Sequence, residues 1–387
     1  MIYETPDCGP EEEAALERIN QIRKQLRYSA SGGRHRWIGS VRRVLAAKAI
    51  QGSNSIEGYN VSDEDAVAAV EGVVEPTDSK WEDYQAVQGY RRAMTYVLQL
   101  AQDEHFEYSA ALFRGLHFMM TEYTLNAGPG LWRPGAIWVR NDATGKTVYE
   151  APSAEYVPGL VDELVNHLSN DQNTPAMVRA AMAHLNLVLI HPFRDGNGRM
   201  ARGLQTLVLA RERIMEPEFC SIEEYLGEAR NTQNYYNMLA EVGRGEWAPE
   251  NDARPWVRYC LQAHYIQANS VLRRVKESEQ MWAEIETLME RHHLPDRSLA
   301  ALFDAVIGLR VRNGIYRATL IDWDEEISNQ TATSDLRAMV NAGLLEQHGI
   351  KRGTSYTAAE PLQEIRLRVR KSREEIDAGA LFSPLSS

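Results

Sequence analysis

The fold is decided near the middle of a chain of 387 residues, by the stretch HPFRDGNGRMAR at positions 191–202. Residues 177–190 before it are apolar at helical spacing, which predicts a buried helix that ends near His191. The helical period resumes at Arg199, so residues 196–198, Gly-Asn-Gly, are expected at a helix N-terminus. The stretch therefore predicts a tight turn between two helices.

The residues of this turn suggest phosphate chemistry. Backbone N–H groups at a helix N-terminus attract anions, and glycine lets a phosphate approach the main chain closely. Arg199 and Arg202 lie three positions apart, where both can reach one polyphosphate. His191 can accept a proton near neutrality, and Asp195 offers the hard oxygen that Mg²⁺ prefers. Each residue alone has a simple structural explanation, but together they predict transfer of a phosphate-containing group to a hydroxyl.

Residues 191–202 resemble the signature of the Fic family, His-x-Phe-x-Asp/Glu-Gly-Asn-Gly-Arg-x-x-Arg, at every fixed position. The resemblance covers roughly Ala110 to Val242. It implies an all-α fold, with a helical core and a small β-hairpin, the flap, over the active site. Family members mostly transfer AMP from ATP to a Ser, Thr or Tyr hydroxyl of a protein, so the resemblance implies that activity here.

The resemblance also assigns roles within the signature. His191 would be the general base, and Asp195 would bind the Mg²⁺ cofactor. The nucleotide phosphates would be held by Asn197 at the α-phosphate, by the Gly196 and Gly198 amides, and by Arg199 and Arg202 at the β- and γ-phosphates.

A second motif lies far upstream, at Ser53-Asn-Ser-Ile-Glu57-Gly58. It resembles the inhibitory motif of the same family, Ser/Thr-x-x-x-Glu-Gly/Asn. Ser53 and Glu57 would share one face of a helix that Gly58 can end. The resemblance implies that Glu57 pairs with Arg202 and so keeps ATP from binding in the reactive orientation. In some relatives the same glutamate positions a water that removes AMP, and this alternative stays open.

Residues 131–150 predict a hairpin, because β-branched and aromatic residues flank a turn rich in Asn, Asp and Gly. By resemblance this hairpin is the flap, and its target-docking residues would be Ala136, Ile137, Trp138 and Val139, which would pair with the backbone of a target. The tripeptide Gly-Lys-Thr at 145–147 is not part of a P-loop, which needs a glycine where Arg140 stands.

Residues 230–239 resemble the family helix that borders the adenine pocket. Asn231, Tyr235 and Tyr236 are therefore candidate nucleotide-binding residues. A tyrosine could stack on the base, although tyrosines on helices are more often core residues.

Composition narrows the class of partner. A net charge of −12 and a pI near 5.4 argue against a chain that binds nucleic acid over its whole surface, and against an anionic membrane as partner. The three cysteines, at 8, 220 and 260, suit neither a disulfide framework nor a zinc site. No apolar run approaches eighteen residues, and the N-terminus lacks a signal-peptide pattern, so a reducing cytoplasm is expected.

The predicted organisation has four parts. They are residues 1–109, an N-terminal helical region with the inhibitory motif; 110–269, the Fic catalytic core; 270–296, a linker helix; and 297–377, a winged-helix-like domain.

The last part rests on three predicted helices and a hairpin. The helices are expected at Ser298–Leu309, Trp323–Ser328 and residues 331–345, and the strands at Leu345–His348 and Ser355–Thr357. Residues 297–377 hold twelve basic and twelve acidic side chains, so they lack the overall basic charge that phosphate contacts favour. Protein docking or a homodimer suits this part at least as well as DNA, which is not favoured.

The sequence thus predicts an autoinhibited, Mg²⁺-dependent protein adenylyltransferase that takes ATP and a protein hydroxyl, with self-modification as one outcome. Two alternatives remain. The same scaffold could remove AMP or transfer another nucleotide or phosphate group. The chain could instead be a winged-helix regulator that senses nucleotide without turnover, although an intact His191 argues against this.

Overall fold

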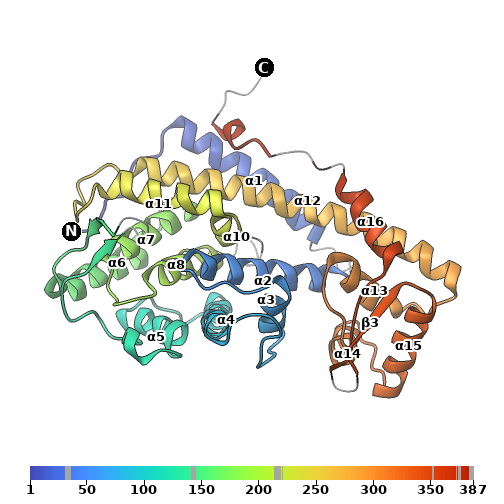
Figure 1. The fold of residues 1–387 in the computed structure, drawn as a ribbon. Helices are drawn as coiled ribbons and strands as arrows, with labels where there is room; N and C mark the ends of the chain where they lie inside the picture. Colours follow the sequence, from blue (N-terminus) through green and yellow to red (C-terminus); the bar gives the residue numbers. More distant parts are fainter. Residues whose placement is uncertain are drawn as a thin grey trace. The chain divides into compact units, whose positions relative to one another are not determined.

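The computed structural model describes all residues except 31–35, 141–144, 213–218, 220, 351–352, 372, 374–375 and 383–387. Helices dominate the described residues, and both of their sheets are two-stranded antiparallel hairpins (Figure 1). The predicted all-α class with a small hairpin is therefore confirmed. In the described part of the chain, no helix is long and apolar enough to span a membrane.

The chain forms two compact units. Unit 1 comprises Met1–Arg23, Ala46–Ala268 and Asp377–Ser387, and unit 2 comprises Lys24–Leu45 and Asn269–Ile376. Three helices have residues in both units: α1 (Pro10–Ala30), α2 (Ile38–Ile56) and α12 (Arg254–His292).

Two predicted boundaries are corrected by this division. Residues 1–109 are not a domain of their own, because most of them belong to unit 1 together with the core. Most of the predicted linker at 270–296 is the second half of α12, a single helix of 39 residues that ends at His292. Its charged sequence suggested a separate segment, yet nothing in it breaks the helix that begins at Arg254.

Unit 1 is built around α7 (Ala176–Ile190) and α8 (Asn197–Arg211), the helices on either side of the signature turn. Every residue of α7 from Met177 to Ile190 is buried, as expected for a helix that is apolar on all sides. Helices α4 (Trp81–Gln102) and α5 (Ala110–Thr121) pack against α8, and α6 (Val157–Asn170) packs against α7. The other helices of the unit are α3 (Asp63–Val70), α10 (Glu223–Gly227) and α11 (Ala229–Gly243), with short 3₁₀ turns at Leu125–Ala127, Ala154–Tyr156 and Ala378–Leu381.

The predicted flap is present as the hairpin of β1 (Trp138–Arg140) and β2 (Thr147–Glu150), with Val139 opposite Tyr149. The turn at 141–144 lies outside the described residues. The Tyr149 hydroxyl donates a hydrogen bond to the carbonyl of Leu189, 2.8 Å away in the last turn of α7. This bond anchors the hairpin beside the start of the signature turn.

Unit 2 contains three short helices, a hairpin and a final helix. In order they are α13 (Ser298–Ile307), α14 (Asn313–Ile321), α15 (Asn329–Asn341), β3 (Leu345–His348), β4 (Ser355–Ala358) and α16 (Glu360–Lys371). The hairpin tip at 351–352 lies outside the described residues.

One helix of unit 2 was placed wrongly from the sequence. The second helix is α14, at Asn313–Ile321, and not Trp323–Ser328. The predicted segment is a connection in which Asp324 has a left-handed backbone (φ 60°). Ser328 does not end a helix but begins one, because its hydroxyl accepts a hydrogen bond from the Thr331 N–H and caps α15.

Candidate active site

His191 follows the last residue of α7 and has a left-handed backbone, with φ 51°. Its N–H donates to the carbonyl of Leu187 at 3.1 Å, which closes the helix. Glycine usually occupies this position, because other residues are strained there. The strained turn directs the chain from α7 into the signature loop, and it places an imidazole where a glycine would be the easier choice.

The His191 ring is held in one tautomer. Its Nδ1 lies 3.1 Å from the carbonyl oxygen of Val188, which can only accept, so Nδ1 carries the proton. Nε2 therefore keeps its lone pair. Burial lowers the pKa of His191, which keeps the ring neutral at pH 7. A neutral imidazole with a basic Nε2 is the form that a general base requires.

Asn197 holds the signature loop together. Its Oδ1 accepts from the Phe193 N–H and its Nδ2 donates to the Phe193 carbonyl, both at 2.9 Å. These bonds leave one hydrogen of the Asn197 side-chain amide available, so the predicted α-phosphate contact of Asn197 depends on that single donor.

The N-terminus of α8 is open to an anion. Its N-cap, Gly196, has φ 75° and supplies no side-chain cap. The Gly196 N–H donates to Oδ1 of Asp195 at 2.7 Å, so this amide is satisfied by the neighbouring carboxylate. For Gly196 to form part of the predicted anion hole, its N–H must therefore break or share its hydrogen bond to the Asp195 carboxylate.

Asp195 suits a metal that is bound mainly by a nucleotide. Its side chain is 46% exposed, and Oδ2 lies 3.7 Å from Nη2 of Arg199. Among the described residues, no cluster of three or more His, Cys, Asp or Glu side chains could hold a metal ion. One carboxylate beside a helix N-terminus that favours anions fits Mg²⁺, which commonly combines one or two carboxylates with substrate phosphates.

Both signature arginines are buried but keep free donors. Arg199 donates to the Tyr123 hydroxyl at 3.1 Å, and its guanidinium lies 4.9 Å from the Tyr59 ring centre. Arg199 Nε and Nη2 and Arg202 Nη1 are buried without a hydrogen-bond partner in the described structure. A buried cationic N–H without a partner is costly. The arginines are therefore well suited to receive the oxygens of a polyphosphate.

Glu57 and Ser53, at the end of α2, contact Arg202. Oε1 of Glu57 lies 2.7 Å from Arg202 Nη2, and the Ser53 hydroxyl accepts from Arg202 Nε at 2.8 Å. A methyl group on Gly198 would stand 2.2 Å from Oε1 of Glu57. The carboxylate thus lies against the first turn of α8, where the helix favours an anion.

The electrostatics of this pair favour the charged form. Burial alone would raise the pKa of Glu57, but Arg202 and Arg199 outweigh it and hold the pKa below its usual range. Glu57 is therefore an anion at pH 7, paired with an arginine that is 1% exposed.

The predicted adenine-side residues divide into three kinds. Tyr235 is 1% exposed, and its hydroxyl lies 3.0 Å from Nε2 of His184 in the core of unit 1. A ring enclosed by core side chains cannot stack on a base, so the structure argues against stacking by Tyr235, while a contact of Tyr235 with the nucleotide stays a prediction. Tyr236 is 44% exposed and donates to the Ile56 carbonyl at 2.9 Å, next to Glu57. Asn231 donates to the Tyr225 carbonyl near the start of α11.

Of the four predicted target-docking residues of the flap, two lie in a strand and two precede it. Trp138 and Val139 are in β1, and the Trp138 side chain is exposed. Ala136 and Ile137 precede the strand, and the Ile137 carbonyl accepts from the Ala151 N–H at 3.3 Å. Only part of the predicted docking segment is therefore strand.

Arg133 is a site residue that the sequence did not indicate. It is buried, and its Nε donates to the carbonyl of His191 at 2.8 Å. Its other nitrogens donate to the carbonyls of Gly135 and Pro152 on the two sides of the flap. Arg133 thus connects the backbone of His191, the candidate general base, to the two ends of the flap hairpin. Its position inside the predicted flap sequence was the only available signal.

His117 is a second residue that was missed. It lies on α5, and its ring stacks on Phe193 with centres 3.7 Å apart and planes 2° apart. Burial lowers its pKa to about 4, so the ring is neutral. A single histidine within an apolar helix carries no sequence signal that separates a site residue from a core residue.

The site thus combines a strained histidine with a basic Nε2, a helix N-terminus without a side-chain cap and two buried arginines in a helical fold. Residues 107–209 match the model of the Fic/DOC family, a region that contains the whole signature. Residues 107–209 of this chain are therefore a Fic domain.

Curated relatives support this assignment. The chain is 34% identical over 213 residues to the protein adenylyltransferase fic-1 of Caenorhabditis briggsae, which covers 54% of this chain and 38% of the relative. It is 29% identical over 98 residues to a probable protein adenylyltransferase of Aquifex aeolicus, which covers 25% and 31%. The chain therefore spans well under half the length of these relatives.

Solved structures share the fold. A Fic family protein from Desulfovibrio desulfuricans G20 superposes with a TM-score of 0.58 at 20% identity, covering 92% of this chain and 98% of that one. Fic-1 from C. elegans gives a TM-score of 0.54 at 23% identity, covering 69% of this chain and 73% of that one.

Proposed function

We propose that this chain is a protein adenylyltransferase that transfers AMP from ATP to a Ser, Thr or Tyr hydroxyl, and that Glu57 inhibits it. The observation that carries the proposal is the His191 ring, held with a basic Nε2 beside an uncapped helix N-terminus and two arginines with unpartnered donors. The names of the curated relatives support the same activity.

In the proposed reaction, His191 Nε2 takes the proton of the target hydroxyl. The hydroxyl oxygen attacks the α-phosphorus of ATP, the bond to the bridging oxygen of the β-phosphate breaks, and pyrophosphate leaves. Arg199 and Arg202 hold the departing phosphates, and the flap positions the target backbone. Asp195 would hold Mg²⁺, which when bound neutralises phosphate charge.

Glu57 opposes this reaction in two ways. Its carboxylate occupies the donor of Arg202 that would otherwise contact a phosphate, and it brings a negative charge to the first turn of α8. Ser53 and Tyr236 add hydrogen bonds that hold the end of α2 in place. Inhibition would therefore end when the end of α2 moves away from Arg202.

The test uses wild type, Glu57→Gly and the double variant Glu57→Gly/His191→Ala, each incubated with ATP and Mg²⁺. Glu57→Gly is expected to gain about 329 Da per AMP, while wild type gains little. The double variant should lose about 10²–10⁴-fold in labelling rate but still bind ATP. Intact-mass analysis and isothermal titration measure the two quantities. Equal labelling of both Glu57→Gly proteins would exclude His191 as the base, and no labelling of either would favour AMP removal or another nucleotide.

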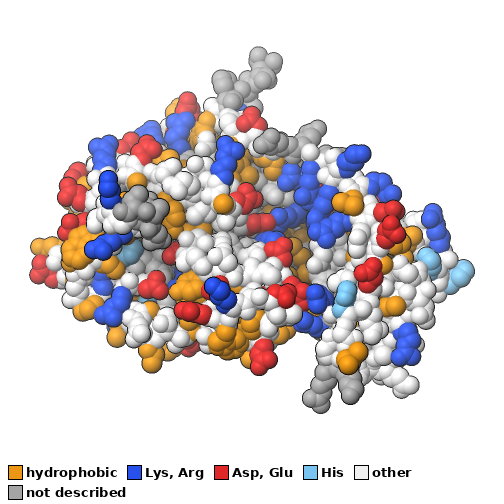
Figure 2. Space-filling view, viewed as in Figure 1, with side chains coloured by type: hydrophobic (Ala, Val, Ile, Leu, Met, Phe, Trp, Pro, Cys, Tyr) orange, Lys and Arg blue, Asp and Glu red, His pale blue; other side chains and the backbone are white. Residues whose placement is uncertain are grey.

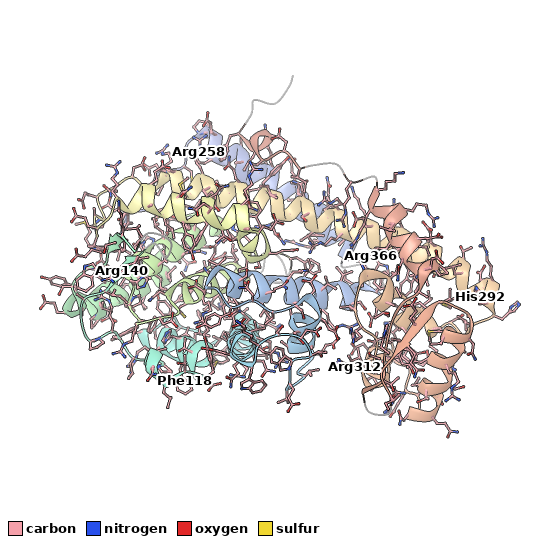
Figure 3. All side chains as sticks on the ribbon, viewed as in Figure 1. Phe118, Arg140, Arg258, His292, Arg312 and Arg366 are labelled. Atoms are coloured by element: carbon pink, nitrogen blue, oxygen red, sulfur yellow. The ribbon has the colours of Figure 1, made fainter. Side chains whose placement is uncertain are left out.

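We further propose that α13–α15 with the β3–β4 hairpin form a winged-helix-like module that docks protein. Within unit 2, Figure 2 shows basic side chains gathered over α12 and α16, and Figure 3 places Arg366 on α16. Arg370 belongs to this group: its pKa is lowered to about 10 by burial and by Arg366 and Arg373 nearby. On the face that Figure 2 shows, the basic side chains thus gather over α12 and α16 and not over α15, the helix that would enter a DNA groove in such a module.

A further inference from the structure

His117 connects α5 to two loops of the site. The backbone N–H of Gly130 donates to Nδ1 of His117 at 2.9 Å, so Nδ1 is the acceptor and cannot carry the proton. Nε2 therefore carries it, and Nε2 lies 2.8 Å from the carbonyl oxygen of Asp195. The hydrogen-bond partners thus fix a tautomer opposite to that of His191, with Nε2 as donor.

The hydrogen bond from His117 Nε2 to the Asp195 carbonyl fixes the orientation of the whole Asp195–Gly196 peptide unit. A peptide unit is planar, and its C=O and N–H point in opposite directions. Holding the Asp195 carbonyl toward His117 therefore aims the Gly196 N–H away from α5, toward the Asp195 carboxylate. Glycine at φ 75° could otherwise let this peptide rotate, because it tolerates most backbone conformations.

The packing around the ring supports a specific orientation. The stacked Phe193 ring covers one face of the His117 ring. The Thr121 methyl group packs against Gly196, 3.0 Å from the position that a Cβ on Gly196 would occupy. The neighbouring Phe118 is exposed and points outward from α5 (Figure 3). The His117 ring therefore lies between α5 and the signature loop, and its orientation is set by the stacked Phe193 ring and by the hydrogen bonds at both ring nitrogens.

We propose that His117 is a positioning residue that locks the Asp195–Gly196 peptide and so presents the Asp195 carboxylate and the N-terminus of α8 to the nucleotide phosphates. The structural part of this inference stands on the contacts of His117 alone. Its consequence for catalysis rests on the proposed function.

The test compares His117→Gln with His117→Asn in the Glu57→Gly background. A glutamine amide can reach the position of Nε2 and donate to the Asp195 carbonyl, whereas an asparagine is shorter and can replace only the acceptor at Nδ1. Phe118→Gln is the matched control, because it changes the adjacent, outward-facing residue. Hydrogen–deuterium exchange of the peptide covering residues 191–202 measures the loop, and the kcat and KM of AMP transfer measure the site.

We expect His117→Asn to raise exchange of the loop and to lower kcat/KM by roughly tenfold, mainly through kcat, as loss of one buried hydrogen bond implies. His117→Gln and Phe118→Gln should stay within about threefold of the parent. Equal behaviour of the Asn and Gln variants, whether both like the parent or both impaired, would overturn the inference.

Two features keep the test decisive. If His117→Asn does not fold, the comparison of His117→Gln with the parent still tests the proposal. Faster hydrogen–deuterium exchange of residues 191–202 in His117→Gln would contradict the proposed donor role of His117. If the parent transfers no AMP but His117→Asn alone raises loop exchange, the proposed function fails while the positioning role of His117 holds.

Discussion

At the scale of single residues, Glu223 is a buried carboxyl group whose pKa is raised toward neutrality. It lies at the start of α10, 2% exposed, and its Oε1 accepts from the Tyr90 hydroxyl at 2.5 Å. Burial raises its pKa to about 7, and the hydrogen bond from Tyr90 and the charge of Arg202 only partly oppose the effect. The group is therefore partly protonated at neutral pH, while Glu57, also near Arg202, stays ionised.

Glu223→Gln is expected to remove a pH dependence of stability. Because the folded pKa of about 7 lies above the ordinary value of 4.5, the folded state binds the proton more tightly. The resulting stability is complete below about pH 4.5 and is lost as the pH rises to about 7. Thermal unfolding at pH 5 and pH 8 should show wild type losing on the order of 2 kcal/mol more than the variant. Parallel losses in both proteins would show that Glu223 ionises normally.

At the scale of secondary structure, the backbones of α2 and α10 lie in close contact at two glycines, Gly52 and Gly227. A Cβ on Gly52 would stand 2.3 Å from the carbonyl oxygen of Glu223, and a Cβ on Gly227 would stand 2.4 Å from the Cα of Gly52. No side chain fits between these backbones. The contact sets the position of α2 one residue before Ser53, and hence the reach of Glu57 toward Arg202.

Gly52→Ala is expected to push the end of α2 outward, to destabilise the protein by about 1–3 kcal/mol and to raise AMP incorporation toward that of Glu57→Gly. Gly39→Ala is the matched control on the same helix, because a Cβ there meets nothing within 4 Å. The control should keep wild-type labelling and gain a few tenths of a kcal/mol from helix propensity. Intact-mass analysis and thermal unfolding check both. Unchanged labelling of Gly52→Ala would mean that inhibition does not depend on this contact.

At the scale of the whole molecule, unit 2 has a buried ion pair of its own. Arg43 lies 2.7 Å from Oδ2 of Asp304, whose side chain is 2% exposed, and also donates to the Thr319 hydroxyl. Burial raises the pKa of Asp304 even though Arg43 opposes it, so desolvation of the carboxylate is only partly offset.

Asp304→Ala is expected to destabilise unit 2 by about 3 kcal/mol, because it leaves the Arg43 guanidinium without its counter-ion. The double variant Arg43→Met/Asp304→Leu should recover most of this loss, since it removes both charges. Asp322→Asn, at an exposed position, should change stability by less than about 0.5 kcal/mol. Chemical denaturation of the full chain measures all three, and a loss in the double variant equal to that in Asp304→Ala would show that packing, not charge, sets the effect.

Local rules explain what could be predicted. α7, the signature turn and α8 follow from helical periodicity and from glycines that permit positive φ, which depend only on residues near in sequence. The same rules located the flap and both strands of unit 2. They failed at residues 323–328, where the cap that starts α15 was taken for the end of a helix.

Long-range packing decided the rest. Glu57 and Arg202 are 145 positions apart, and only the resemblance to a family, not their spacing, suggested that they pair. Nothing local distinguishes Tyr235 in the core from Tyr236 at the surface, because burial depends on which elements pack against each residue. His117 and Arg133 became site residues only when α5 and the flap met the signature loop. The chain thus encodes its helices and its signature turn in short stretches, whereas the partners of Arg202, His117 and Arg133 are in place only once distant segments are brought together.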